Sequence, residues 1–281
     1  MDDAQNVTLP TIAMLGAGSM GRAILSGLLA PGIQVAGIRV TNRSAARAAE
    51  LAGAPGVTAY ATETRADANR LAVEGAQVVL VAVKPAMVRD LLAEIGDSLA
   101  PGTVVVSVAA GVTAATMESL LPDSVSVVRA MPNTPAVVGK AVTGVSAGSR
   151  TEPEDLALVR TLFETVGEVV EVPESQLDAL STISGSGPAY VFLLIEALTE
   201  AAVQKGFTPA QAATLVNGTF LGAAELLVSS GEAPAELRRR VTSPNGTTER
   251  AIAVLAEADL PALFARATDA ALARARALAA G

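Results

Sequence analysis

Three glycines near the start of the chain have the spacing that binds a dinucleotide. The run GAGSMG occupies residues 16–21, after a mostly apolar stretch at 11–15 and before a helix-like stretch. In such a loop Gly16 permits a tight turn, Gly18 lets the backbone approach a pyrophosphate, and Gly21 lets the helix pack closely on the strand. The N-terminus of that helix offers unpaired N–H groups and the positive end of its dipole to the anion. An ordinary glycine-rich loop is the alternative, but the strand before it and the helix after it favour a dinucleotide.

The segment after the second expected strand favours NADP over NAD. An NAD site usually has Asp or Glu about 20 residues beyond the glycine loop, where it accepts a hydrogen bond from the ribose 2′-OH. Residues 41–44 are TNRS and contain no carboxylate. Arg43 can pair with a 2′-phosphate, and Asn42 and Ser44 can donate hydrogen bonds to it. Alternatively, Asn42 or Ser44 caps a helix beside a solvated arginine. We therefore expect NADPH as the cofactor, with NADH also possible.

Three further segments follow expected strands, and ligands of open α/β sheets bind at the carboxyl ends of the strands. They are AVKP at 82–85, VAAG at 108–111 and RAMPNTP at 129–135. The small residues of the second segment would let a flat ring approach the backbone. Each signal is weak alone, because prolines after strands are ordinary in loops.

Two loops in the second half of the chain are rich in glycine and hydroxyl groups. They are ISGSGPAY at 183–190 and VTSPNGTT at 241–248. The second gathers backbone N–H groups and four hydroxyls at the start of an expected helix, where they can hold a small carboxylate without an arginine. Helix capping uses the same residue types and explains one or two of these hydroxyls, but not this density.

The elements that must position these segments differ between the two halves. The first half alternates β-branched runs with helix-like stretches, which is typical of a largely parallel, doubly wound sheet. The expected strands are residues 11–15, 34–41, 57–60, 77–83, 103–108, 125–129, 141–147 and 168–172. Helices are expected between most of them, as at 43–51, 87–99 and 152–165. The last two strands have shorter connections and are candidates for antiparallel pairing.

The second half contains helical patterns only. They cover residues 174–184, 188–206, 209–230, 234–241, 248–258 and 261–280. We predict an α/β protein, with a Rossmann-like doubly wound domain over residues 1–173 followed by an all-α domain over 174–281. Residues 188–202 are apolar at most positions, so that helix must be covered on all sides. Helices interleaved between two chains are favoured over a helix buried within one subunit.

Composition excludes several kinds of function. The 281 residues carry 20 basic and 28 acidic side chains, and the net charge of −8 argues against nucleic acid as a partner. The absence of cysteine and histidine excludes thiol catalysis and removes the usual general base and zinc ligand, so no metal is expected. The acidic N-terminus lacks a signal pattern, and Glu196 and Glu200 interrupt the most apolar helix. We therefore expect a cytoplasmic protein without membrane partners.

Taken together, these segments make the sequence similar to the pyrroline-5-carboxylate reductase family. The matching motifs are, in order, GAGSMG, NRS, AVKP, AAGV, RAMPNTPA, SGSGPAY and SPNGTT. The last is the most specific, and the family usually has glycine where Asn245 stands here. Asparagine tolerates left-handed backbone angles, so the shape of the loop can survive. The resemblance implies NAD(P)H-dependent reduction of 1-pyrroline-5-carboxylate to L-proline, the last step of proline biosynthesis. It also implies homodimers, often assembled further through the helical domain.

The resemblance also implies roles for individual residues. Those implied at the pyrophosphate and adenosine are Gly16, Gly18, Ser19, Met20, Gly21, Asn42, Arg43 and Ser44. Those implied at the ribose and nicotinamide are Asn69, Ala82, Val83, Lys84, Pro85, Ala109, Ala110 and Gly111. Those implied at the substrate are Ser243, Asn245, Gly246, Thr247 and Thr248.

This reduction can proceed without histidine. An imine nitrogen is basic enough to arrive protonated, so the enzyme needs positioning more than acid catalysis. The Thr248 hydroxyl would orient the nitrogen and relay a proton. Lys84 is the alternative acid, although a role in anchoring the cofactor or its loop is favoured. Two other functions stay open: a different NADP-dependent imine or β-hydroxyacid reductase, and a non-catalytic NADP-binding sensor or scaffold.

Overall fold

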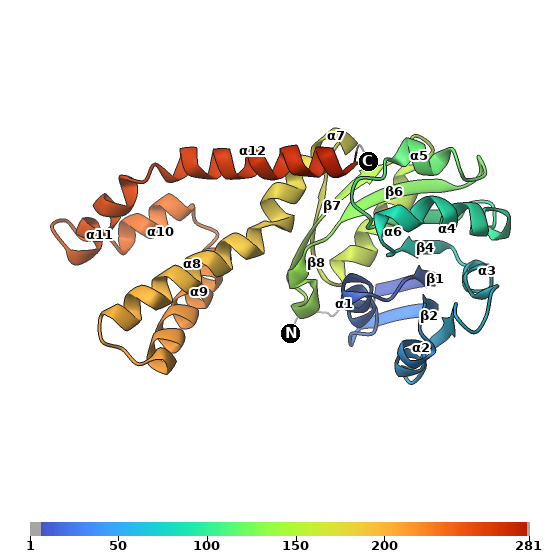
Figure 1. The fold of residues 1–281 in the computed structure, drawn as a ribbon, viewed down its shortest axis with the longest axis horizontal. Helices are drawn as coiled ribbons and strands as arrows, with labels where there is room; N and C mark the ends of the chain where they lie inside the picture. The colour runs from blue at the N-terminus through green and yellow to red at the C-terminus, as the bar shows by residue number, and fades with distance from the viewer. Residues whose placement is uncertain (1–6, 280–281) are drawn as a thin grey trace. The chain divides into compact units, whose positions relative to one another are not determined.

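The computed structural model describes residues 7–279, which pack into two compact units (Figure 1). The first unit comprises the described residues up to Ser186 together with those from Leu272 onward, and the second comprises Gly187–Ala271. All described strands belong to the first unit, and the second contains only helices. The packing boundary after Ser186 falls within the segment that the sequence analysis assigns to the helical domain.

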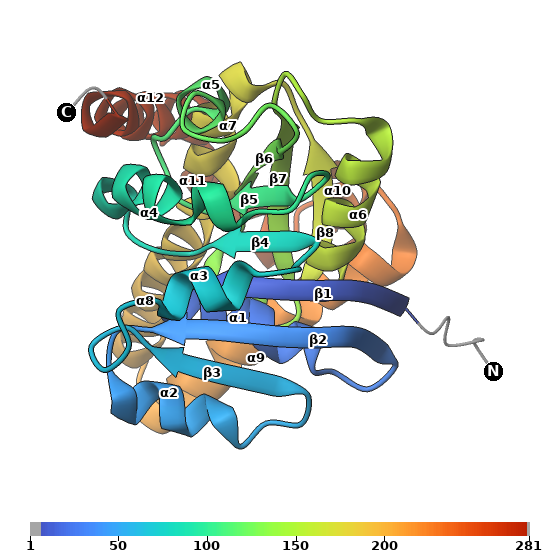
Figure 2. The ribbon, with the colours of Figure 1, turned by 90° about the vertical axis from the view of Figure 1, so that its right-hand side faces the viewer.

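The first unit is built on one eight-stranded sheet, and every expected strand is present in it. Across the sheet the order is β3-β2-β1-β4-β5-β6-β7-β8 (Figure 2). The strands are β1 (Val7–Leu15), β2 (Ile33–Asn42), β3 (Val57–Ala61), β4 (Val78–Val81), β5 (Val104–Ser107), β6 (Ser126–Met131), β7 (Ala141–Ala147) and β8 (Gly167–Glu171). The pairings among β1 to β6 are all parallel. The doubly wound sheet expected from the sequence is confirmed.

The last two strands run against the others but parallel to each other. β7 pairs antiparallel with β6, whereas β8 pairs parallel with β7. Parallel neighbours need a long crossover, and the helix α6 (Pro153–Glu164) supplies it between β7 and β8. Antiparallel pairing was therefore the right expectation for β7 on β6 and the wrong one for β8 on β7.

Helices cover both faces of the sheet and form two separate cores. Along β1, Ile12 and Met14 enter one core while Ala13 and Leu15 enter the other, as the alternation of side chains in a strand requires. The first core also contains side chains of α1 (Ser19–Leu28) and α6. The second contains side chains of α3 (Ala68–Val73), α4 (Val88–Ile95) and α5 (Ala114–Glu118). Because both faces are covered, the open edge at the strand ends is the place left for a ligand.

All six helices expected in the second half are present. They are α7 (Glu174–Leu180), α8 (Gly187–Gln204), α9 (Pro209–Ser230), α10 (Pro234–Arg240), α11 (Thr247–Ala256) and α12 (Leu260–Ala279). The expected end of the last helix at residue 280 lies outside the described residues. A π-helical turn over Ser181–Gly185 follows α7, so the helix expected over 174–184 ends in a wider turn that runs into the loop expected from residue 183.

The helices of the second half leave much apolar surface exposed. α8 has no buried residue, and its Phe192 and Leu193 side chains are 60% and 64% exposed. By length and composition alone, Glu174–Gln204 and Pro209–Ser230 could each cross a membrane, with mean hydropathy of 1.2 and 1.3. This corrects the expectation that Glu196 and Glu200 interrupt such a stretch, since two charges do not exclude it. A helix that is apolar around its girth needs a cover.

Candidate functional site

The loop between β1 and α1 has the shape that a bound pyrophosphate needs. Gly16 has φ +97°, and a Cβ there would lie 2.8 Å from the Ala82 carbonyl oxygen. A Cβ on Gly21 would lie 2.5 Å from the Gly16 carbonyl oxygen, so helix and loop are in close contact. A Cβ on Gly18 would meet no atom within 4 Å. The two outer glycines thus shape the loop, while Gly18 faces open space.

The N-terminus of α1 is available to an anion. Gly18 is the N-cap residue and provides no side-chain cap, and the first turn contains no acidic residue. Unpaired N–H groups and the positive end of a helix dipole together favour a bound phosphate.

The end of β2 contributes Asn42, Arg43 and Ser44 in different ways. Asn42 is buried, its Nδ2 donates to the Ala17 carbonyl at 3.3 Å, and its Oδ1 accepts from the Ser44 N–H at 3.3 Å. This amide therefore joins the glycine loop to the end of β2. Arg43 is exposed and forms no ion pair with any described residue. Ser44 is the N-cap residue of α2 (Ala45–Ala52), but its side chain makes no capping bond.

A carboxylate that the local sequence does not reveal reaches the same place. Glu63, in the loop after β3, accepts a hydrogen bond from the Ala45 N–H on its Oε1 at 2.6 Å. Residues 41–44 contain no carboxylate, as the sequence shows, but the fold brings one to the next residue from elsewhere in the chain. Only the register of β3 beside β2 could have revealed this contact.

The ends of β4 and β5 lie next to the glycine loop. The Ala82 N–H donates to the Leu15 carbonyl at 2.8 Å, and the Val108 N–H donates to the Val81 carbonyl at 3.1 Å. These contacts bring AVKP at 82–85 and the small residues Ala109, Ala110 and Gly111 to one edge of the sheet with residues 16–21. Lys84 is exposed there and forms no ion pair with any described residue.

Asn69 lies in the first turn of α3, a helix that the sequence analysis did not predict. Its Nδ2 donates to the Oε2 of Glu94 on α4 at 3.0 Å. The Asn69 Oδ1 accepts no hydrogen bond from any described residue and remains a free acceptor.

The segment RAMPNTP anchors the start of the helical half. Arg129 is buried, and its Nη1 lies 2.9 Å from the Oε1 of Glu174, which also accepts from the Ala114 N–H at 2.7 Å. Asn133 donates from Nδ2 to the Ser184 carbonyl of the π-helical turn at 2.9 Å. The Arg129 and Asn133 side chains are therefore engaged in contacts within the protein.

In the second unit, the loop before α11 has one engaged hydroxyl, that of Thr242, which donates to the Arg238 carbonyl at 2.6 Å. Asn245 has φ +58°, the left-handed conformation that the sequence analysis expects it to tolerate. Gly246 is the N-cap residue of α11 and provides no side-chain cap. The hydroxyls of Ser243, Thr247 and Thr248 form no hydrogen bond with any described residue. The backbone N–H of Asn245 already donates to the Oε2 of Glu249 at 2.8 Å, so this backbone N–H is not available to a substrate carboxylate.

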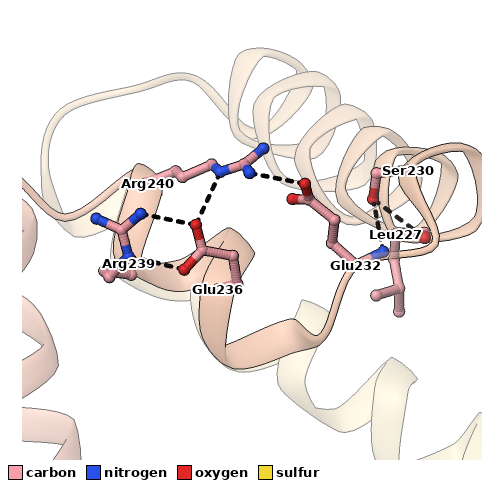
Figure 3. A network of polar contacts seen from close by, with 6 residues as sticks. All are labelled: Leu227, Ser230, Glu232, Glu236, Arg239 and Arg240. Carbon is pink, nitrogen blue, oxygen red and sulfur yellow. Dashed lines mark hydrogen bonds and ion pairs between the residues drawn. The ribbon is translucent and has the colours of Figure 1, made fainter.

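Ion pairs hold α10, which leads into that loop (Figure 3). The Glu236 Oε1 lies 2.7 Å from the Nη2 of Arg239 and 3.0 Å from the Nε of Arg240, and Arg240 also pairs with Glu232. The hydrogen bonds from Arg239 and then Arg240 lower the pKa of Glu236 to about 2. The carboxylate is therefore ionised at neutral pH. Of the three consecutive arginines at 238–240, Arg239 and Arg240 form ion pairs within the chain.

Two protein families match different parts of the chain. Residues 174–278 match the family described as pyrroline-5-carboxylate reductase dimerisation. Residues 11–111 match the family described as NADP oxidoreductase, coenzyme F420-dependent.

Individual relatives match nearly the whole chain. The pyrroline-5-carboxylate reductase of Corynebacterium melassecola is 42% identical over 265 residues, which cover 93% of this chain and 96% of that protein. The structure of a pyrroline-5-carboxylate reductase from Coxiella burnetii has a TM-score of 0.87 at 37% identity, covering 98% and 99% of the two chains. The Plasmodium falciparum pyrroline carboxylate reductase with NADP bound shares the fold, with a TM-score of 0.79 at 24% identity over 98% and 99%.

Proposed function

This chain belongs to the pyrroline-5-carboxylate reductase family, and on that premise we propose which of its residues carry out the NADPH-dependent reduction of 1-pyrroline-5-carboxylate to L-proline. The observation that carries the proposal is the uncapped N-terminus of α1 beside the open space at Gly18. An uncapped helix N-terminus beside open space fits a pyrophosphate.

The proposed cofactor-binding residues belong to the first unit. Residues 16–21 bind the pyrophosphate through backbone N–H groups, and Arg43 and Ser44 bind the adenosine side. When bound, the nicotinamide supplies the hydride. Asn69 accepts a hydrogen bond from a ribose hydroxyl, which its fixed amide orientation supports. The residues that flank the nicotinamide are Ala82, Val83, Lys84, Pro85, Ala109, Ala110 and Gly111.

The proposed substrate-binding residues belong to the second unit. Ser243, Thr247 and the backbone N–H groups from Thr247 onward bind the substrate carboxylate at the N-terminus of α11, whereas the Gly246 N–H donates to the Ser243 carbonyl at 3.0 Å. Thr248, half-buried in this turn, directs its hydroxyl to the imine nitrogen. Because the imine arrives protonated, these contacts mainly fix its orientation, and positioning supplies a large part of the rate enhancement. Lys84 anchors the cofactor rather than donating a proton.

The relatives and the dimerisation family support a homo-oligomer, and we propose specifically a homodimer formed through a helical domain at 174–281, beside a cofactor domain at 1–173. The exposed apolar side chains of α8 and α9 support a second copy of the chain as their cover, rather than a membrane. A cytoplasmic location belongs to the same proposal.

The dimer can be tested by sedimentation velocity. We expect Leu193→Glu, at a position 64% exposed on α8, to shift the protein to monomers, because burying a charge at a dimer interface is costly. Val170→Glu, at a position 43% exposed on β8, is the control and should sediment like the wild type. If the Leu193 variant also sediments like the wild type, the proposed interface is wrong.

The reaction itself can be tested by following the absorbance of NADPH with two cyclic imines, 1-pyrroline-5-carboxylate and piperideine-6-carboxylate. We expect rapid oxidation of NADPH with the first. Oxidation with the second substrate alone would indicate a different imine reductase. No oxidation with either, despite binding of NADPH, would indicate the non-catalytic sensor.

A further inference from the structure

Glu63, in the loop after β3, brings a negative charge to the proposed adenosine side of the cofactor site. Its backbone N–H donates to the Arg43 carbonyl at 3.1 Å, and its Oε1 accepts from the Ala45 N–H at 2.6 Å. The preceding Thr62 N–H donates to the Asn42 carbonyl at 2.9 Å. Two backbone hydrogen bonds thus fix the loop, and the carboxylate lies at the N-terminus of α2.

The carboxylate lies beside the end of β2, where a dinucleotide-binding sheet would hold a 2′-phosphate. In dinucleotide-binding sheets, the group at the end of β2 either accepts from the ribose 2′-OH or pairs with the 2′-phosphate. Arg43 and the N-terminus of α2 attract a phosphate, but Glu63 already holds the Ala45 N–H and repels a second anion.

We propose that Glu63 is a specificity-determining residue that weakens the preference for NADPH over NADH. It supplies from the loop after β3 the carboxylate that β2 lacks, and it opposes Arg43 within the same site. This inference rests on the proposed function, because it assumes that the adenosine binds at residues 42–45.

A purely structural cap on α2 is the competing explanation, and glutamine separates the two. Glu63→Gln keeps an oxygen that can accept from the Ala45 N–H but removes the charge. The substitution should therefore preserve the capping hydrogen bond to α2 but abolish the repulsion of a phosphate.

The test measures binding of two nucleotides to the full chain by titration calorimetry. The probes are 2′,5′-ADP, which carries the 2′-phosphate, and 5′-AMP, which does not. The readout is the ratio of their dissociation constants, Kd of 5′-AMP divided by Kd of 2′,5′-ADP. We expect Glu63→Gln to raise this ratio about 5-fold or more, since one unit charge near a phosphate costs on the order of a tenfold change in affinity.

Two variants frame that result. Arg43→Ala should lower the ratio about tenfold or more, because it removes the charged partner of the 2′-phosphate. Glu154→Gln removes an exposed carboxylate from the first turn of α6 and should leave the ratio unchanged. The effect of Glu63→Gln should also shrink at high salt, since exposed charges are screened.

Two outcomes would count against different parts of the argument. If both nucleotides bind to the wild type and Glu63→Gln changes their ratio no more than Glu154→Gln does, Glu63 is only a helix cap. If neither nucleotide binds to the wild type, the cofactor site proposed above is wrong, and the inference falls with it.

Discussion

Gly18→Ala should weaken NADPH binding about 10- to 100-fold, the value of one or two lost hydrogen bonds to a charged group. The added methyl group enters the open space beside the loop, where the backbone must approach the pyrophosphate. Gly18 has φ −72° and ψ −167°, an extended conformation that alanine adopts readily. The fold should therefore tolerate the change, with a loss of at most about 1 kcal/mol in the free energy of unfolding from the poorer N-cap.

Gly21→Ala is the matched comparison, because its methyl group meets protein instead of ligand. Its Cβ would lie 2.5 Å from the Gly16 carbonyl oxygen, so α1 must move away from the loop. We expect a loss of about 1–3 kcal/mol in the free energy of unfolding, the usual cost of overpacking. Denaturant unfolding and titration with NADPH on both variants check the pair. If the Gly18 variant binds NADPH like the wild type, the pyrophosphate does not bind at this loop.

The strands were predictable because their signal is local. Val78–Val81 is a continuous apolar run, which is expected where both faces of a sheet are covered, and it forms the centre of the sheet. The left-handed backbone at Asn245, with φ +58°, was also expected, since asparagine is one of the few residue types that tolerate it. By contrast, α3 and α5 have 6 and 5 residues, too few for a helical period to appear.

The contacts that define the site were not readable, because they join distant positions. Glu63 reaches Ala45 only after β3 pairs with β2, and Glu174 reaches Arg129 only after the chain has passed through β7 and β8. In both cases the sequence shows that a charged residue is present, but only the fold shows which group that charge contacts. Sequence therefore identified which segments reach the edge of the sheet, but not which polar groups remain available there.

Thr248→Ala should lower kcat about 5- to 150-fold, which corresponds to a loss of ~1–3 kcal/mol when one hydrogen bond is left unmade. The hydroxyl forms no hydrogen bond with any described residue, and the residue lies in the first turn of α11. Its removal should therefore leave the fold intact. Steady-state kinetics with 1-pyrroline-5-carboxylate measure the effect, and the melting temperature of the variant should match that of the wild type.

The size of that loss decides which role Thr248 has. Thr248→Ser retains the hydroxyl and should recover most of the activity, whereas a role in packing alone would make serine and alanine equally poor. A loss beyond ~10⁴-fold in the alanine variant would mean obligatory general acid catalysis, since it reaches the top of the usual range for that role. If instead Thr248→Ala has no effect on kcat and Lys84→Met abolishes turnover without weakening NADPH binding, the exposed lysine at the end of β4 is the acid. We expect neither extreme. An imine that arrives already protonated needs Thr248 to orient it, and it needs no side chain to donate a proton.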